Sequence, residues 1–173
     1  MGRKLKNPTS GNAPAAIAIK LQIFLMMTLP ITHLPDILSL IPQRDPMLMV
    51  DSLWEYTPST AVAGLTISSK NLFVQENYLQ EAGLIEHLAQ SIALHNGYCY
   101  YLNGQPAPMG YIGAIKKINI EALPAVGQSL RTHLTIVHEF MGVTLVRLQS
   151  FVEKKLMAEG EMKTVLASLA EQP

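Results

Sequence analysis

The segment GLIEHLAQSIALHNGYCYYL, residues 83–102, decides the fold of this chain. Its length predicts a helix of about five turns, and Asn103-Gly104 predicts where that helix ends. The apolar residues wrap most of its circumference: Leu84, Ile85, Leu88, Ala89, Ile92 and Ala93. A helix that is apolar nearly all round is typical of a buried element. We therefore expect one long central helix that the rest of the chain covers.

Strand patterns flank this helix on both sides. After a short helix over residues 33–40, strands are predicted over residues 47–56 and 60–68, and a polar loop over residues 70–81 leads into the helix. Four strands follow, which we interpret as a meander: residues 109–120, 129–140, 143–153 and 156–166. This order predicts an α+β fold in which an antiparallel sheet is wrapped around one long central helix.

Composition narrows the class of protein. The 173 residues are 49% hydrophobic and 15% charged, with a formal net charge of zero. This length suits one domain with a real core, and the low charge points to a subunit interface. Without a basic excess, nucleic acid is not an expected partner. The single cysteine, Cys99, excludes an internal disulfide and is typical of the reducing cytoplasm. We expect no metal and no cofactor, because no histidines and carboxylates have the spacing of metal ligands.

The first residues mimic a secretory signal. Arg3, Lys4 and Lys6 precede an apolar run over residues 13–29. Lys20 interrupts that run and leaves no unbroken apolar span of about 18 residues, so a transmembrane helix is not expected. We interpret residues 1–27 as an extension, disordered or preceding a natural start near Met26 or Met27, and residues 28–173 as a single domain.

Three strings of residues carry a resemblance to a known family. They are IPQRDPMLMVD at residues 41–51, EHLAQ at residues 86–90, and GAIKK at residues 113–117 followed by GQSL at residues 127–130. In this order and spacing the chain resembles the 3-hydroxyacyl-(acyl-carrier-protein) dehydratases. Residues 82–90 are similar to the dehydratase-like proteins of aryl-polyene and flexirubin pigment clusters. The resemblance implies the hot-dog fold, a dimer whose sheets join edge to edge, and an acyl thioester of acyl-carrier protein or coenzyme A in a tunnel beside the central helix.

The resemblance also implies that two residues, one from each subunit, carry out the catalysis. In the family a histidine in the loop before the helix removes the alpha proton, and a helix carboxylate from the partner subunit handles the hydroxyl that leaves as water. Glu86 stands at the carboxylate position, but the loop over residues 71–81 contains no histidine. We therefore expect either a homodimer or a heterodimer with a histidine-bearing hot-dog paralogue.

Glu86 and His87 are the candidate catalytic residues. Glu86 is the only acidic residue of the segment 83–102, and a carboxyl set in an apolar helix is a candidate general acid or base. The alternative is an exposed glutamate that stabilises the helix start. His87 points about 100° away round the helix, so a structural or interface role is weighed against a role as base.

Four residues are candidates for substrate binding. Gln90 shares a helix face with Glu86 and would position it or a water. Gly83, at the helix start, would offer backbone N–H groups to a thioester oxyanion, with a simple hinge as the alternative. Tyr78 is expected to shape the tunnel, and Gly113 opens the third string.

Three functions remain open from the sequence. The first is a dehydratase, or the dehydratase-like half of a heterodimer, in fatty-acid or polyene-type biosynthesis. The second is a hot-dog acyl thioesterase that uses Glu86. The third is a non-catalytic acyl-binding subunit.

Overall fold

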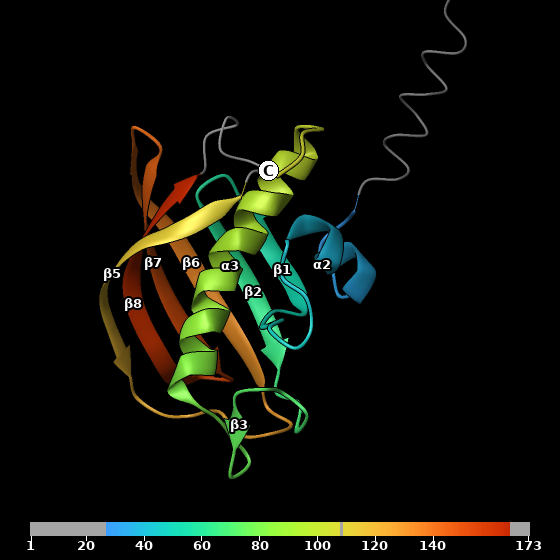
Figure 1. Ribbon diagram of the computed structural model, residues 1–173, viewed down its shortest axis with the longest axis vertical. Helices are drawn as coiled ribbons and strands as arrows, with labels where there is room; N and C mark the ends of the chain where they lie inside the picture. Colours follow the sequence, from blue (N-terminus) through green and yellow to red (C-terminus); the bar gives the residue numbers. More distant parts are fainter. Residues whose placement is uncertain (1–26, 108, 167–173) are drawn as a thin grey trace, which may run out of the picture.

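The computed structural model describes residues 27–107 and 109–166. The extension expected over residues 1–27 lies outside them except for Met27. A six-stranded antiparallel sheet curls around one long helix, α3 (Glu81–Leu102) (Figure 1). The predicted α+β architecture is confirmed, and a sheet wrapped around a single helix is the hot-dog arrangement.

The strands of the sheet do not all follow chain order. Their bounds are β1 (Ser52–Thr57), β2 (Thr60–Thr66), β5 (Gly110–Ile120), β6 (Ser129–Phe140), β7 (Val143–Val152) and β8 (Lys155–Leu166). They lie in the order β1-β2-β6-β7-β8-β5. The predicted four-strand meander is therefore wrong for β5, which pairs with β8 at the edge while β6 pairs with β2. Alternation of apolar residues identifies strands, but it does not identify their neighbours.

Two further predictions needed correction. The strand predicted from Met47 begins at Ser52, because the backbone before it is bonded to side chains of α3. The predicted polar loop contains a small hairpin of β3 (Val74–Gln75) and β4 (Tyr78–Leu79). Its turn residues Glu76 and Asn77 have positive φ values of 51° and 64°, a conformation that asparagine tolerates better than most residues.

Helix α3 fills the concave side of the sheet. Its Leu84, Leu88 and Leu94 are fully buried in one cluster with sheet residues such as Leu134 and Leu148. Burial of each such leucine contributes roughly 1.5–3 kcal/mol. The apolar circumference of α3 is thus explained by the sheet on one side and the segment around α2 on the other.

The short helix α2 (Leu34–Leu40) packs near the far end of α3. A Cβ atom at Gly97 of α3 would overlap the backbone carbonyl of Leu40. Glycine at this position therefore lets the end of α2 approach the α3 backbone. No helix in the described part of the chain is both long and apolar enough to cross a membrane.

Candidate active site

Glu86 lies in the second turn of α3 on the wall of a cavity. The side chain is half-buried, and the cavity has a volume of about 610 Å³. Its Oε1 atom accepts a hydrogen bond of 2.8 Å from Nε2 of Gln90, one helical turn further on. The carboxylate is thus neither in bulk water nor sealed in the core, and it faces a space that admits a ligand.

Gln90 holds Glu86 in place. Its buried carboxamide donates from Nε2 to the Met47 carbonyl over 2.6 Å as well as to Glu86, and its Oε1 accepts from the Met49 N–H over 2.7 Å. A primary amide has two N–H donors, and both are used. Because the carboxamide is fixed on three sides, it sets the orientation of the Glu86 carboxylate.

His87 points away from Glu86 into the core, with no exposed surface. Its Nδ1 lies 2.6 Å from the Met49 carbonyl, and its Nε2 lies 2.7 Å from Oγ1 of Thr132. A carbonyl only accepts, so Nδ1 carries the proton and Nε2 accepts from the Thr132 hydroxyl. That hydroxyl in turn lies 2.7 Å from Oγ of Ser150, which donates to it.

The pKa of His87 reflects this position. Burial lowers it to about 4, and the hydrogen bond to the Met49 carbonyl and the charge of Asp51 oppose that shift only in part. His87 is therefore neutral near pH 7. It does not line the cavity, so its contacts in this chain tie α3 to the Met49 backbone and to the sheet.

The cavity runs along one face of α3. Its floor includes Glu86, Ala89, Ala93 and Gly97, and at about 1.5 Å per residue these eleven steps span roughly 16 Å. The other lining residues come from the segment around α2 and from the ends of β5 and β8, among them Leu40, Ile41, Pro42, Gln43, Arg44, Met109, Tyr111, Ile112, Thr164 and Leu166. A mostly apolar groove with a carboxylate at one end suits an acyl chain.

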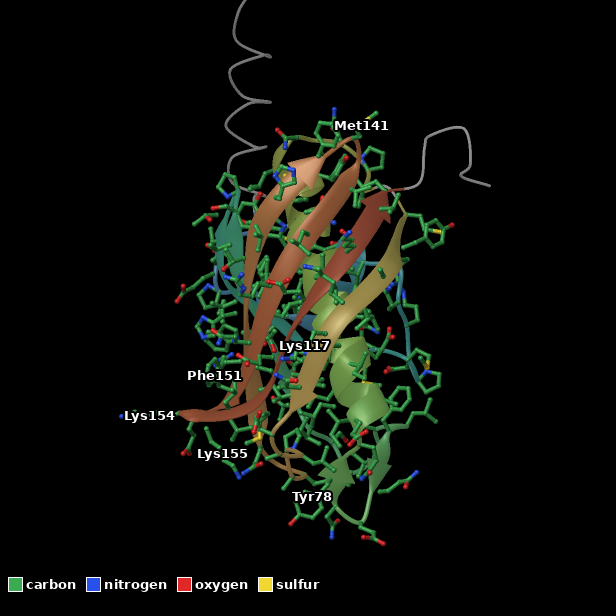
Figure 2. All side chains as sticks on the ribbon, turned by 90° about the vertical axis from the view of Figure 1, so that its left-hand side faces the viewer. Tyr78, Lys117, Met141, Phe151, Lys154 and Lys155 are labelled. Carbon is green, nitrogen blue, oxygen red and sulfur yellow. The ribbon has the colours of Figure 1, made fainter. Side chains whose placement is uncertain are left out.

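The structure brings together only part of the predicted site. Glu86 and Gln90 meet at the cavity, whereas Tyr78, Gly83 and Gly113 do not line it. Tyr78 is 48% exposed in strand β4 of the hairpin, at the end of the molecule opposite Met141 (Figure 2). A Cβ atom at Gly83 would collide with Phe73 and Leu79, so this glycine allows close packing of the first turn. Substrate contacts by these three residues remain predictions.

Sequence reasoning missed most of the cavity wall. Ala89, Ala93 and Gly97 recur every four residues and so share one helix face, a signal that could have identified the floor. Gln43 was visible only as a member of the first string. Within residues 27–107 and 109–166, no group of histidine, cysteine, aspartate or glutamate side chains could hold a metal ion.

Comparisons with known proteins identify the family of this chain. A family model described as ApeP-like, ApeP dehydratase, matches residues 35–171. The 3-hydroxyacyl-(acyl-carrier-protein) dehydratase FabZ of Lactobacillus helveticus is 24% identical over 141 residues, which is 76% of this chain and 90% of that protein. FabZ of Ruminiclostridium cellulolyticum is 25% identical over 134 residues, covering 74% and 92%.

A solved structure shares the fold. The dehydratase heterocomplex ApeI:P from Xenorhabdus doucetiae contains a chain that superposes with a TM-score of 0.73 at 14% identity, covering 84% of this chain and 95% of that one.

The buried neutral histidine predicts a pH-dependent stability. Because the folded-state pKa of His87 is about 4 and the unfolded value is about 6.5, the unfolded state takes up a proton first as the pH falls. The contribution of the neutral His87 side chain to the free energy of unfolding is fully present above about pH 6.5 and is lost as the pH falls toward 4. At pH 5 the loss is about 2 kcal/mol.

Chemical denaturation of wild type and His87→Gln at pH 7 and pH 5 measures this effect. The difference in unfolding free energy between the two proteins should shrink by about 2 kcal/mol at pH 5. The matched control is His133→Gln, at an exposed position of β6, which should keep the wild-type pH dependence. If the difference in unfolding free energy between wild type and His87→Gln is the same at both pH values, His87 is not the source of the pH dependence.

Proposed function

Because this chain belongs to the ApeP-like dehydratase family, we propose that it is the carboxylate-bearing half of a two-subunit 3-hydroxyacyl-thioester dehydratase. The reaction removes the alpha proton and the 3-hydroxyl of a 3-hydroxyacyl thioester, releases water and leaves a 2-enoyl thioester. Acyl-carrier protein is the proposed carrier, since the curated relatives are named for that substrate. The observation that carries the proposal is the Glu86 carboxylate, oriented by Gln90 at the wall of a mostly apolar groove.

Glu86 is assigned the proton that the leaving hydroxyl needs. A hydroxyl leaves as water only after it gains a proton, and a carboxyl group within hydrogen-bond reach can supply it. The fixed carboxamide of Gln90 keeps one carboxylate oxygen engaged, which leaves the other free to face the substrate. Glu86 therefore acts as the general acid in the forward direction and as the base in the reverse direction.

The base for the alpha proton is missing from the cavity. All five histidines lie in the part of the chain that the structure describes, and none of them lines the cavity. His87 has both ring nitrogens engaged in the core. In a homodimer of this family type the base would come from the loop before the other copy's helix, and in this sequence that loop, residues 71–81, contains no histidine. We therefore assign the base to a different, histidine-bearing subunit. The heterocomplex ApeI:P is a precedent for such pairing.

The edge strand β5 offers the surface for that subunit. It ends the sheet order, so one of its backbone edges is unpaired within the described residues. Residues Gly110–Lys117 of β5 are all exposed, including the apolar Tyr111 and Ile115. An edge strand presents unpaired backbone N–H and C=O groups, with which a strand of another chain can pair. Since Gly110, Tyr111 and Ile112 also line the cavity, a subunit bound at β5 would cover the cavity that Glu86 faces.

The first test of this function is complementation. The isolated chain should release almost no water from a 3-hydroxyacyl-carrier-protein substrate, because it lacks the base. Addition of a hot-dog paralogue with a histidine in the loop before its helix should restore turnover, followed by absorbance of the enoyl thioester. Full activity of the isolated chain would refute the two-subunit version, and release of free thiol would instead indicate a thioesterase.

The second test removes the proposed acid. In the assembled complex, Glu86→Gln should lower kcat by at least about 100-fold, the range that a general acid contributes. Glu81→Gln makes the same chemical change one turn earlier at an exposed position and should leave kcat unchanged. Wild-type kcat for Glu86→Gln would favour the non-catalytic, acyl-binding function.

The third test concerns the β5 edge. Ile115→Lys places a charge in the proposed interface and should prevent assembly with the paralogue, measured by analytical ultracentrifugation. Leu72→Lys is the matched control, because Leu72 is 55% exposed and Ile115 is 51% exposed. If the two variants assemble equally well, β5 is not the interface.

A further inference from the structure

Thr164 of β8 has a free hydroxyl in the wall of the cavity. The residue is 6% exposed, and it lines the same cavity as Glu86. Its hydroxyl has no hydrogen-bond partner among the described residues. Within the same residues, Oε1 of Gln43 is the one side-chain atom that is unpaired and also closed off from any open space. The Thr164 hydroxyl is therefore unpaired and still accessible.

The side chain of Thr164 points to the concave side of the sheet, where α3 lies. Successive side chains of a strand point to opposite faces of the sheet. Met162, two residues earlier in β8, is fully buried in the core, whereas Lys163 and Val165 are exposed on the other face. The open space that the Thr164 hydroxyl reaches is thus the cavity and not the outer surface of the sheet.

A hydrogen bond between α3 and the sheet locates Thr164 along the cavity. Nε2 of His87 lies 2.7 Å from Oγ1 of Thr132, and Thr132 is aligned across β7 with Ala158 of β8. Thr164 lies six residues further along β8, which is roughly 20 Å at about 3.3 Å per residue. This direction leads away from the β3–β4 hairpin, from which α3 starts (Figure 2). Thr164 and Glu86 therefore lie toward opposite ends of the cavity.

Asn96 adds a second polar group toward the end that contains Thr164. It lies ten residues after Glu86, about 15 Å along α3, and its half-buried side chain lines the cavity. That side chain makes one long contact among the described residues, 3.4 Å from Oδ1 to Nδ1 of His95. Between Glu86 and Asn96 the floor of the groove includes Ala89 and Ala93. The floor is thus polar at both ends and apolar between them.

The hydroxyl of Thr164 has no role in the fold. A buried hydroxyl without a hydrogen-bond partner lowers the stability of the folded protein. Valine has the same branched shape and would fill this position of β8 without an unpaired polar atom. A bound group that forms a hydrogen bond with the hydroxyl would explain why a threonine serves at this position.

We propose that Thr164 is a specificity-determining residue, whose hydroxyl forms a hydrogen bond with a polar group of the bound thioester. This assignment rests on the proposed function. A plain alkyl chain has no hydrogen-bonding group. The partner of Thr164 is therefore either a polar group at the far end of the acyl chain or an amide or hydroxyl of the pantetheine arm. Both sources share one chemistry, a hydrogen-bonding group roughly 20 Å along the groove from the Glu86 end.

Binding measurements on three kinds of ligand distinguish the two sources. The protein is the complex with the histidine-bearing paralogue. The ligands are alkanoyl pantetheine thioesters of increasing chain length, the same thioesters with a hydroxyl at the end of the chain, and N-acetylcysteamine thioesters, in which the arm ends after its first amide. None of them has a 3-hydroxyl, so the complex cannot dehydrate them.

The change is Thr164→Val, which keeps the shape of the side chain and removes its hydroxyl. The matched control is Thr144→Val, because Thr144 pairs with Thr164 in the sheet and does not line the cavity. Thr164→Ser keeps a hydroxyl at the same position and should bind every ligand as the wild type does. Thr144→Val should leave all Kd values unchanged.

Thr164→Val should raise Kd by roughly three- to tenfold, the range for one hydrogen bond, for the ligands that carry the partner group. A rise confined to chains that end in a hydroxyl assigns the partner to the acyl chain. An equal rise for all pantetheine thioesters, with no rise for the N-acetylcysteamine thioesters, assigns it to the pantetheine arm. The melting temperature should stay level or rise, because the change removes an unpaired polar group.

Three results overturn the assignment. Thr164→Val changes no Kd at any chain length, Thr144→Val raises the Kd values as much as Thr164→Val does, or weaker binding by Thr164→Val comes with a lower melting temperature, which means that the hydroxyl has a structural role. Failure of the proposed function is recognised separately. In that case the unsubstituted complex leaves 3-hydroxyacyl thioesters unchanged, or it releases free thiol from the ligands.

Discussion

The backbone from Met47 to Met49 is held by hydrogen bonds from two neighbouring turns of α3, and the rest of the site depends on this contact. Gln90 binds the Met47 carbonyl and the Met49 N–H, and His87 binds the Met49 carbonyl. These bonds replace those that a strand would have made, so β1 begins only at Ser52. They also fix the carboxamide that orients Glu86. A buried polar group that loses its hydrogen-bond partner destabilises the folded protein. Loss of any one of these hydrogen bonds should therefore lower the stability of the fold.

The pair Glu86 and His87 shows how one helix separates two chemical environments. Adjacent residues on a helix point about 100° apart. That angle sends the carboxylate to the cavity and the imidazole into the core, where burial lowers its pKa and the Met49 carbonyl determines its tautomer. The result is a cavity that is lined by the Glu86 carboxylate and by no histidine. The exposed edge strand β5 borders the same cavity through Gly110, Tyr111 and Ile112, which is where the proposed second subunit would bind.

The sequence predicted the elements of this fold well, and their arrangement less well. The apolar circumference of residues 84–93 predicted a buried helix, and the apolar and alternating runs between turns predicted the strands, with β1 beginning five residues later than expected. The place of β5 at the sheet edge was not predicted, because β5 pairs with β8, which lies far away in the sequence. The β3–β4 hairpin was not predicted, because each of its strands has only two residues, too few to show a period. Of the site, Glu86 was predicted as the only acidic residue of the helix segment, and Gln90 was predicted because it shares a helix face with Glu86. Gln43 and Ala93 were not predicted.

By itself the sequence determined which residues form the central helix, which face of that helix carries Glu86 and Gln90, and that the loop before it lacks a histidine. These are properties of local periodicity and residue identity. Only the tertiary structure decided that Glu86 faces a groove, that His87 is enclosed by Met49 and Thr132, and that the amide oxygen of Gln43 is left unpaired. Burial and hydrogen-bond pairing depend on segments that lie about 40 residues or more apart in the chain, and no local pattern of residues records them.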